Sequence, residues 1–226
     1  MVHNQKQTAI MLFAFSSEKE ANRKVFEESE QLFQQLNRKT LLKAQKTNVD
    51  VVVITEEHQI GATFGERFAN AIQSVFNKGY EQIITLGNDS PNLKTSHLLK
   101  ALHSLQNDEA ALGPSFDGGT YLIALKRTDF VFDSFKNISW NTFKVFSELK
   151  SYFATQNTHV RVLSYLADID SRKDVFFYIH QFKKSISFLQ ELLRTSVIKI
   201  PLYSNNFYVS KKYASLFFNK GSPNTL

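Results

Sequence analysis

The sequence predicts an α/β domain with a mostly parallel central sheet, and three observations support this. Short apolar runs alternate with segments in which apolar residues recur at helical spacing. The first run, residues 8–15 (TAIMLFAF), is apolar throughout, as expected for a strand that helices cover on both faces. At 226 residues the chain is long enough for one large domain, or for a domain with an appendage.

Five more strands are expected after residues 8–15. The next apolar run, VDVVVIT, is rich in β-branched residues. The runs over residues 110–112 and 121–125 flank a glycine-containing segment, which suggests that this segment connects two strands. The five expected strands are residues 49–55, 82–86, 110–112, 121–125 and 159–163.

The predicted helices are identified by their capping residues and apolar spacing. Ser17 with Glu20 forms a candidate capping box for a helix over residues 18–36. Gly79 is expected to end a helix that starts near Phe64. Ser90 suits an N-cap position, with Pro91 at the first helical position. Two further helices are expected, over residues 142–153 and from Ser171 onward with Asp174 completing its capping box.

The composition excludes several classes of enzyme. The chain has no cysteine, so it can form no disulfide, thiolate nucleophile or cysteine-ligated zinc site. Its six histidines show no zinc-protease spacing, and no G-x-S-x-G motif is present. We expect a cytoplasmic protein, because no apolar stretch has the length of a signal peptide core or a membrane span.

The net charge of +6 comes from the C-terminal quarter of the chain. Residues 171–226 contain nine Lys or Arg and two acidic residues, whereas the remainder contains 18 basic and 19 acidic residues. We therefore expect an α/β domain over residues 1–174 and a basic, aromatic-rich helical extension over residues 175–226. The extension is either a solvated helix with a tail or a surface for an anionic partner.

Two polar segments follow predicted strands, where ligands bind in open parallel sheets. In the first segment, Gly87 and Asn88 lead to Asp89, whose carboxylate could hold Mg²⁺ or Mn²⁺ or could simply cap a helix. In the second, Gly118 and Gly119 follow Asp117. This second segment could admit a ligand close to the backbone or form a plain tight turn.

Two weaker signals lie elsewhere. Gly61 opens a loop before a helix that has Glu66 and Arg67 in its first turn, without the Gly-Lys-Ser/Thr of a Walker A loop. Asp168 and Asp170 lie on one side of an extended segment. They could supply a metal ligand, although helix capping by Asp170 and the serine that follows it is the commoner use of such residues.

Taken together, four blocks of sequence resemble one bacterial family of proteins with the glycosyltransferase-A fold. That family is similar to nucleotide-diphospho-sugar transferases and, more distantly, to the guanylyltransferases of molybdenum-cofactor and phospholactate metabolism. The resemblance covers residues 59–174, about half of the chain. The blocks are QIGATFGERFANAIQSVFNKGYEQIITLGNDSPNLKTSHLLKAL, LGPSFDGGTYLIAL, ISWNT and LADIDSRKD.

The resemblance implies a Rossmann-like three-layer sandwich that binds a nucleotide beyond its first strands. It implies a divalent metal held by Asp89 and, with relatives differing there, by Asp170. It also implies that Asp117, Gly118 and Gly119 contact the donor or acceptor. The remaining residues implied at the nucleotide or acceptor are Phe15, Ser16, Arg23, Gly61, Arg67, Gly87, Asn88, Trp140 and Thr142.

The chain departs from the family after its first strand. Typical members have a Pro-Gly-x-x-Lys-Thr-Arg-Leu type of loop there, whereas this chain has SSEKEANRK over residues 16–24, with Arg23 and Lys24 inside a predicted helix.

Three functions follow as hypotheses. The first is a metal-dependent glycosyltransferase with a nucleotide-diphospho-sugar donor, in which Asp117 or Glu66 orients or deprotonates an acceptor hydroxyl. The others are a nucleotidyltransferase of the same fold and a non-catalytic binding or scaffold domain.

Overall fold

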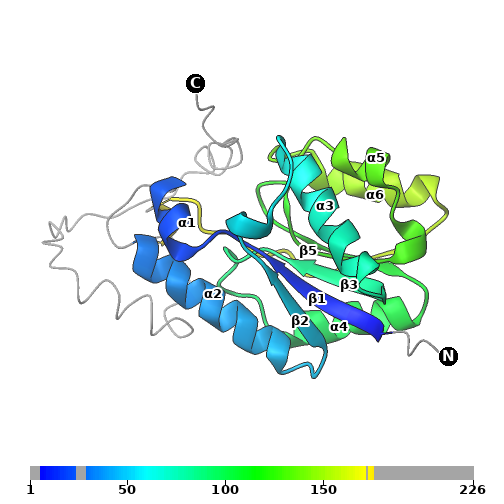
Figure 1. The fold of residues 1–226 in the computed structure, drawn as a ribbon, viewed down its shortest axis with the longest axis horizontal. Coiled ribbons are helices and arrows are strands. Elements are labelled where there is room, and N and C mark those ends of the chain that lie inside the picture. Colours follow the sequence, from blue (N-terminus) through cyan, green and yellow to red (C-terminus); the bar gives the residue numbers. More distant parts are fainter. Residues whose placement is uncertain (1–5, 24–28, 172, 176–226) are drawn as a thin grey trace, which may run out of the picture.

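The computed structural model describes residues 6–23, 29–171 and 173–175, which form a sheet with helices on both faces (Figure 1). The order of the strands across the sheet is β2-β1-β3-β5-β4-β6. All six strands match the apolar runs that predicted them. They are β1 (Lys6–Phe13), β2 (Asp50–Ile54), β3 (Tyr80–Leu86), β4 (Ala110–Pro114), β5 (Thr120–Lys126) and β6 (Val160–Val162).

Only β5 runs against the other described strands of the sheet. It is antiparallel to β3 and β4, while β1 is parallel to β2 and β3, and β6 is parallel to β4. The carboxyl ends of β1, β2, β3, β4 and β6 therefore lie along one edge of the sheet, here called the carboxyl edge. The opposite edge is called the amino edge. This mixed, mostly parallel sheet confirms the predicted fold class.

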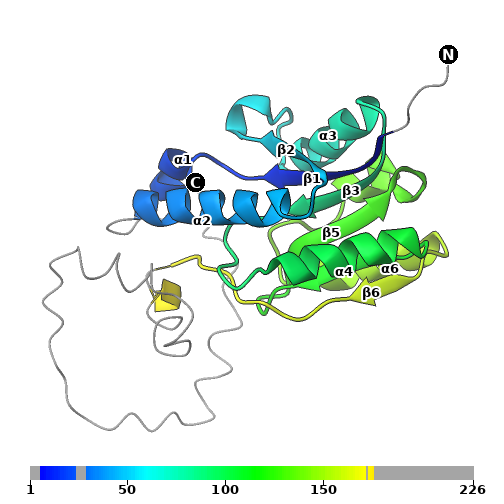
Figure 2. The same cartoon turned by 90° about the horizontal axis from the view of Figure 1, so that it is seen from below.

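The helices form a layer on each face of the sheet (Figures 1 and 2). One layer packs α3, α5 and α6 together, and the other contains α2 and α4. The layers follow from the alternation of apolar side chains in β1, where Ala9 and Met11 face the first layer and Ile10 and Leu12 the second. The helices are α1 (Ser17–Arg23), α2 (Ser29–Gln45), α3 (Phe64–Asn77), α4 (Thr95–Gln106), α5 (Phe132–Lys136) and α6 (Val145–Thr155).

Most of the phenylalanines that the structure describes pack in the first of these layers. The rings of Phe68, Phe135 and Trp140 pack against one another with centroids 5.1–5.7 Å apart. Phe76 and Phe153 are also buried there. The layer over α2 and α4 is mainly aliphatic, so the two faces of the sheet have different packing chemistry.

The predicted N-caps Ser17 and Ser90 are both wrong. Of the helix predicted over residues 18–36, the structure describes α1 (Ser17–Arg23) and the part of α2 from Ser29 onward, and residues 24–28 lie outside the described residues. The hydroxyl oxygen of Ser16, not that of Ser17, accepts a hydrogen bond from the backbone N–H of Lys19 (3.3 Å). At the second site, α4 begins at Thr95 instead of Pro91.

The physical reason for the later start of α4 is that Ser90 is used elsewhere. Its hydroxyl donates to the carboxylate of Asp168. Its carbonyl accepts from the N–H of Leu93 (3.1 Å), which makes a turn before the helix. The predicted helix over residues 142–153 also begins later, at Val145.

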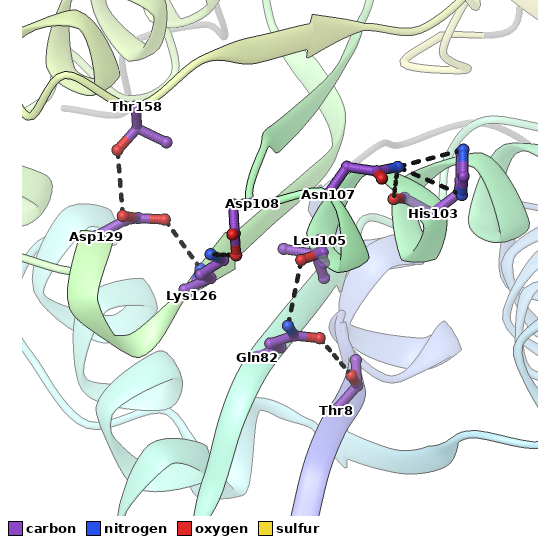
Figure 3. A network of polar contacts seen from close by, with 9 residues as sticks. All are labelled: Thr8, Gln82, His103, Leu105, Asn107, Asp108, Lys126, Asp129 and Thr158. Carbon is purple, nitrogen blue, oxygen red and sulfur yellow. Dashed lines mark hydrogen bonds and ion pairs between the residues drawn. The ribbon is translucent and has the colours of Figure 1, made fainter.

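The amino edge is tied together by a network of paired polar groups (Figure 3). Gln82 on β3 accepts a hydrogen bond from the hydroxyl of Thr8 on β1 (2.8 Å) and donates to the carbonyl of Leu105 on α4 (3.3 Å). Lys126, at the end of β5, forms an ion pair with Asp108. Each group shown meets a partner of complementary charge or hydrogen-bonding type, as expected for a structural network.

The proposed extension over residues 175–226 lies outside the described residues except for Val175. At the start of this region, the carboxylate of Asp174 accepts from the backbone N–H and the hydroxyl of Ser171 (2.7 and 2.8 Å). This pairing is the one predicted for the capping box. Within the part of the chain that the structure describes, no helix is both long enough and apolar enough to cross a membrane.

Candidate functional site

Three loops meet at the carboxyl edge of the sheet. They follow β3 (residues 87–94), β4 (residues 115–119) and β6 (residues 163–170). Backbone hydrogen bonds join them: Phe116 N–H donates to Leu166 (3.1 Å), and Ile169 N–H donates to Asp89 (2.9 Å). The loops are therefore held by main-chain contacts, which fix the positions of their side chains.

These loops bring four carboxylates into one electrostatic cluster, which we call the aspartate cluster: Asp89, Asp117, Asp168 and Asp170. The charges of Asp89 and Asp170 both act on Asp117, and those of Asp89 and Asp117 both act on Asp168. Asp89 and Asp170 are 81 residues apart in the sequence. The sheet brings their loops together, because β3, β4 and β6 all end at this edge.

Burial raises the pKa of the Asp117 carboxyl, and the neighbouring charges of Asp170 and Asp89 raise it further. The backbone N–H of Gly119, which donates to Asp117 Oδ1 (2.9 Å), partly opposes this. Asp117 is nevertheless accessible to solvent. It is therefore an exposed carboxylate with increased basicity, which suits a group that accepts a proton from a hydroxyl.

Asp168 lies deeper in the aspartate cluster. Burial of its carboxyl raises its pKa well above the ordinary value, and the charge of Asp89 adds to this. The hydroxyl of Ser90 donates to Asp168 and stabilises the charged form. Because Ser90 and Asp89 are adjacent, this bond fixes the loop that carries Asp89.

Glycines allow the backbone to pass close to the aspartate cluster. Gly118 has φ +91°, and a Cβ there would overlap with the carbonyl oxygen of Phe143. A Cβ on Gly87 would lie 3.2 Å from Asp89 Oδ1. Gly87 also donates its N–H to the carbonyl of Tyr121 on β5 (3.1 Å). Gly118 and Gly87 thus have steric reasons to be glycine, irrespective of a ligand.

The loop after β1 is hydrogen-bonded to a carboxylate from the segment after β2. Glu56 accepts hydrogen bonds from the backbone N–H of Ser16 (2.7 Å) and from its hydroxyl (2.5 Å). Although burial acts to raise it, these bonds lower the pKa of Glu56. The N–H that would face a phosphate therefore already has a negatively charged partner.

Asn37 on α2 links this first loop to the loop after β3. Its amide donates to the carbonyl of Phe15 (3.3 Å), and its oxygen accepts from Asn88 (2.7 Å). Phe15 and Asn88 are thus brought to the same side chain. Arg23 is the last residue of α1, and its side chain lies outside the described part of the structure.

The residues of the loop before α3 form local contacts. The Glu66 carboxylate accepts from the N–H groups of Ala62 (2.7 Å) and Thr63 (3.1 Å), completing a capping box, and these bonds lower its pKa. Arg67 donates to the carbonyl of Ala62 (3.2 Å). Gly61, with φ +140°, gives the room that this arrangement requires.

Trp140 belongs to the aromatic layer of the core. Its ring packs on Phe64, Phe68 and Phe135, and Nε1 donates to the carbonyl of Phe135 (3.0 Å). The hydroxyl of Thr142 donates to the carbonyl of Ser139 (2.6 Å). The contacts of Trp140 and Thr142 are thus those of a packed aromatic residue and a turn.

The aspartate cluster has the donor chemistry that Mg²⁺ and Mn²⁺ prefer, since all its ligand atoms are carboxylate oxygens. Among the described residues, no group of three or more His, Cys, Asp or Glu side chains is arranged to hold a metal ion. Two carboxylates completed by phosphate oxygens are the common arrangement for Mg²⁺ in phosphate-transfer sites. Asp89 and Asp170 remain the predicted pair, and both lie near enough to Asp117 for their charges to act on it.

Two residues of the site, Asn37 and Glu56, were not selected from the sequence as functional, and Asp168 was considered only together with Asp170 as a possible metal ligand. Asp168 was visible only as half of an Asp-Ile-Asp alternation with capping as the alternative. Asn37 and Glu56 lie on a helix and after a strand, with no local signal, and they enter the site through contacts 40 to 51 residues distant. Only the sheet order could have identified them.

Comparison with known proteins agrees with this architecture. In a search among curated proteins, no match was found. The chain is similar to the crystal structure of a candidate nucleotide-diphospho-sugar transferase from Desulfovibrio desulfuricans G20, with a TM-score of 0.70, 24% identity, and 83% of this chain and 94% of that chain covered.

A second solved structure shares the fold at lower similarity. It is a 4-diphosphocytidyl-2C-methyl-D-erythritol synthase from Anaerococcus prevotii DSM 20548, with a TM-score of 0.50, 10% identity, and 80% and 100% of the two chains covered. At these identities the likeness establishes a nucleotide-diphospho-sugar transferase fold and not an activity. The profile of the family described as "Uncharacterized protein conserved in bacteria (DUF2064)" matches residues 20–142, which is more than half of the sequence. The chain therefore belongs to the bacterial family DUF2064.

Proposed function

We propose that this protein is a divalent-cation-dependent glycosyltransferase that uses a nucleotide-diphospho-sugar donor. The observation that carries the proposal is the aspartate cluster at the carboxyl edge, where ligands bind in open sheets. Burial and the charges of neighbouring aspartates raise the pKa of Asp117 and of Asp168, and such like charges are costly to maintain in a domain without a cation to neutralise them.

Asp89 and Asp170 would hold the cation. A bound Mg²⁺ or Mn²⁺ would neutralise the negative charge of the donor diphosphate as it leaves. Asp168 is a positioning residue, because it holds Ser90 and therefore the loop of Asp89.

Asp117 is the group that would orient the acceptor hydroxyl and accept its proton. Its raised pKa makes it a better base than an ordinary aspartate, and it is exposed. Glu66 is less suited to this role, because its carboxylate is bound in the capping box of α3 and its pKa is lowered. The geometry therefore favours Asp117 over Glu66.

One observation supports a different function. In the loop after β1, the Glu56 carboxylate already accepts from the N–H and the hydroxyl of Ser16. The negative charge of Glu56 would repel a phosphate at this loop and so oppose its binding. This favours a non-catalytic relative whose carboxyl edge binds a partner instead of a donor. The two functions differ in whether nucleotides bind at all.

The test is thermal unfolding of the full chain with nucleoside diphosphates, nucleoside triphosphates and nucleotide sugars, each with and without Mn²⁺ or Mg²⁺. A ligand at about 100 times its Kd stabilises by about 2.7 kcal/mol, or roughly 5–10 °C for a domain of this size. We expect a cation-dependent shift with one nucleotide class that Asp89→Asn removes. Asp133→Asn, a change at an exposed carboxylate of α5, should retain it.

A shift that persists in Asp89→Asn would contradict the assignment of Asp89. The absence of any shift up to millimolar nucleotide would contradict donor binding and favour the non-catalytic function. Release of pyrophosphate from a nucleoside triphosphate in the presence of a sugar phosphate would instead identify a nucleotidyltransferase.

A further inference from the structure

Three large aromatic side chains are exposed next to the aspartate cluster. Phe116 is 55% exposed, Phe143 65% and Tyr165 49%, although this chain buries most of its described large apolar side chains. Phe116 and Tyr165 belong to two of the loops that carry the aspartates. Exposed apolar groups gathered around polar ones mark ligand-binding surfaces more often than isolated exposed side chains do.

We call these three exposed residues, Phe116, Phe143 and Tyr165, the aromatic platform. The rings of Phe116 and Tyr165 lie 5.6 Å apart between centroids with an interplanar angle of 31°. Phe146 supports Tyr165 from the side, at 6.0 Å and 70°. The two tilted rings thus contact each other while both stay exposed, and together they present apolar surface to the solvent.

The main chain fixes this platform beside Asp117. Phe116 directly precedes Asp117, and its N–H bonds to Leu166, the residue after Tyr165. On the other side of the turn, the backbone of Phe143 packs against Gly118, whose carbonyl accepts from the N–H of Phe146 (2.9 Å). Little backbone ordering is then required on binding, which favours affinity.

We propose that the aromatic platform binds the acceptor and that the acceptor is a carbohydrate. A sugar ring would lie with its C–H face on Phe116 and Tyr165 and present a hydroxyl to Asp117. This inference rests on the proposed function for the role of Asp117, but the platform itself is independent of the donor.

The combination of chemistries selects this class of ligand. A pyranose ring has an apolar C–H face and hydroxyl donors on one small body, which match rings and a carboxylate side by side. A lipid chain or an apolar protein surface would cover Asp117 without donating a hydrogen bond, and a buried unpaired carboxylate is costly. We assign to the platform the contact with the acceptor that the family resemblance implied for Trp140, because the ring of Trp140 is packed in the aromatic layer.

The test uses saturation-transfer NMR of the full chain with the methyl α- and β-glycosides of glucose, galactose, mannose and N-acetylglucosamine as probes. We expect transfer to the ring C–H protons of at least one glycoside. Phe116→Leu and Tyr165→Ala should each weaken its binding about two- to tenfold, the range expected for loss of one aromatic contact. Phe116→Tyr, which keeps the ring, should bind as the wild type does.

The control is Leu99→Ala, which removes an equally exposed apolar side chain from α4. It should leave glycoside binding unchanged, and thermal unfolding should show that all four variants are folded. Binding that Phe116→Leu retains in full would overturn the platform, because the apolar area alone would then suffice. The absence of transfer to every glycoside would overturn it as well.

Nucleotide-dependent thermal shifts of the same preparations separate the two proposals. If nucleotides bind and no glycoside does, the acceptor class proposed here is wrong and the donor site stands. If glycosides bind through the platform while no nucleotide binds, the platform stands and the glycosyltransferase proposal fails.

Discussion

The two edges of the central sheet carry polar residues that are organised in opposite ways. At the amino edge, Gln82, Lys126 and their neighbours pair with complementary groups (Figure 3). At the carboxyl edge, the aspartate cluster sets like charges against one another. The same strands support both edges, so the difference teaches that the amino edge is paired for stability, whereas the carboxyl edge carries an electrostatic cost of the kind that is common at functional sites.

The largest effect is expected from two glycines at opposite edges. Gly118 and Gly79 have nearly the same backbone angle, φ +91° and +93°, but a Cβ on Gly118 would overlap with Phe143 whereas nothing lies within 4 Å of one on Gly79. Gly118→Ala should lower the free energy of unfolding by about 3 kcal/mol or more, and Gly79→Ala by about 1 kcal/mol. Urea unfolding of both variants measures this, and equal losses would show that the carboxyl edge can relax.

The next effect concerns the charge of Asp168. A raised pKa means that the folded state prefers the protonated acid, so stability is greatest at acidic pH and falls as pH rises through the folded-state pKa. Asp168→Asn should remove that fall and raise stability at neutral pH on the order of 2 kcal/mol, while still accepting from Ser90.

The measurement is thermal unfolding between acidic and neutral pH without added cation. An Asp168→Asn profile parallel to that of the wild type would mean that the aspartate cluster stores no electrostatic cost. The comparison of the two edges would then lose its basis.

A smaller effect is expected at the amino edge. Gln82→Ala removes the bonds to Thr8 and Leu105 and should cost about 1 kcal/mol of stability. Nucleotide and glycoside binding should not change, because the contacts of this residue lie at the far end of the sheet. A loss of ligand binding without a larger loss of stability would show that the two edges are coupled.

A similar size of effect is expected for the first loop. Glu56→Gln removes the negative charge that holds Ser16 and should tighten nucleotide binding about threefold. Glu57→Gln, at the exposed neighbouring residue, is the matched control and should change nothing. Weaker binding in Glu56→Gln would show that Glu56 supports the loop for its ligand and does not compete with it.

The smallest effect is expected for Glu66→Gln. Glutamine also completes a capping box, so melting temperature and transfer activity should both stay close to those of the wild type. A large loss of kcat with unchanged stability would make Glu66 the base in place of Asp117.

Much of the fold could be predicted from the sequence because strand signals are local. All six apolar runs became strands, and Gly79 closes α3 as expected, donating its N–H to the carbonyl of Phe76 (2.9 Å). The direction of β5 was open, since a short connection between two strands is decided by pairing and not by composition.

The site was predictable only where its residues follow strands directly. Asp89 and Asp117 stand at strand ends, so their nearness followed from the rule for open sheets. Ser90 was expected to cap a helix, but a distant carboxylate competes for its hydroxyl. The roles of Glu56 and Asn37 depend on such long-range partners, which periodicity does not reveal.

The single antiparallel strand has a consequence for how this site can change. Because β5 returns beside β4, Asp117 and Phe116 sit at the tip of a hairpin whose two strands are paired, with a shift of register between Gly113 and Pro114. An exposed side chain at such a tip tolerates changes of sequence without moving the strands. Of residues 115–119, Phe116 is therefore the position where the proposed acceptor specificity can be altered by substitution, while the packed Gly118 and the loops of Asp89 and Asp170 stay as they are.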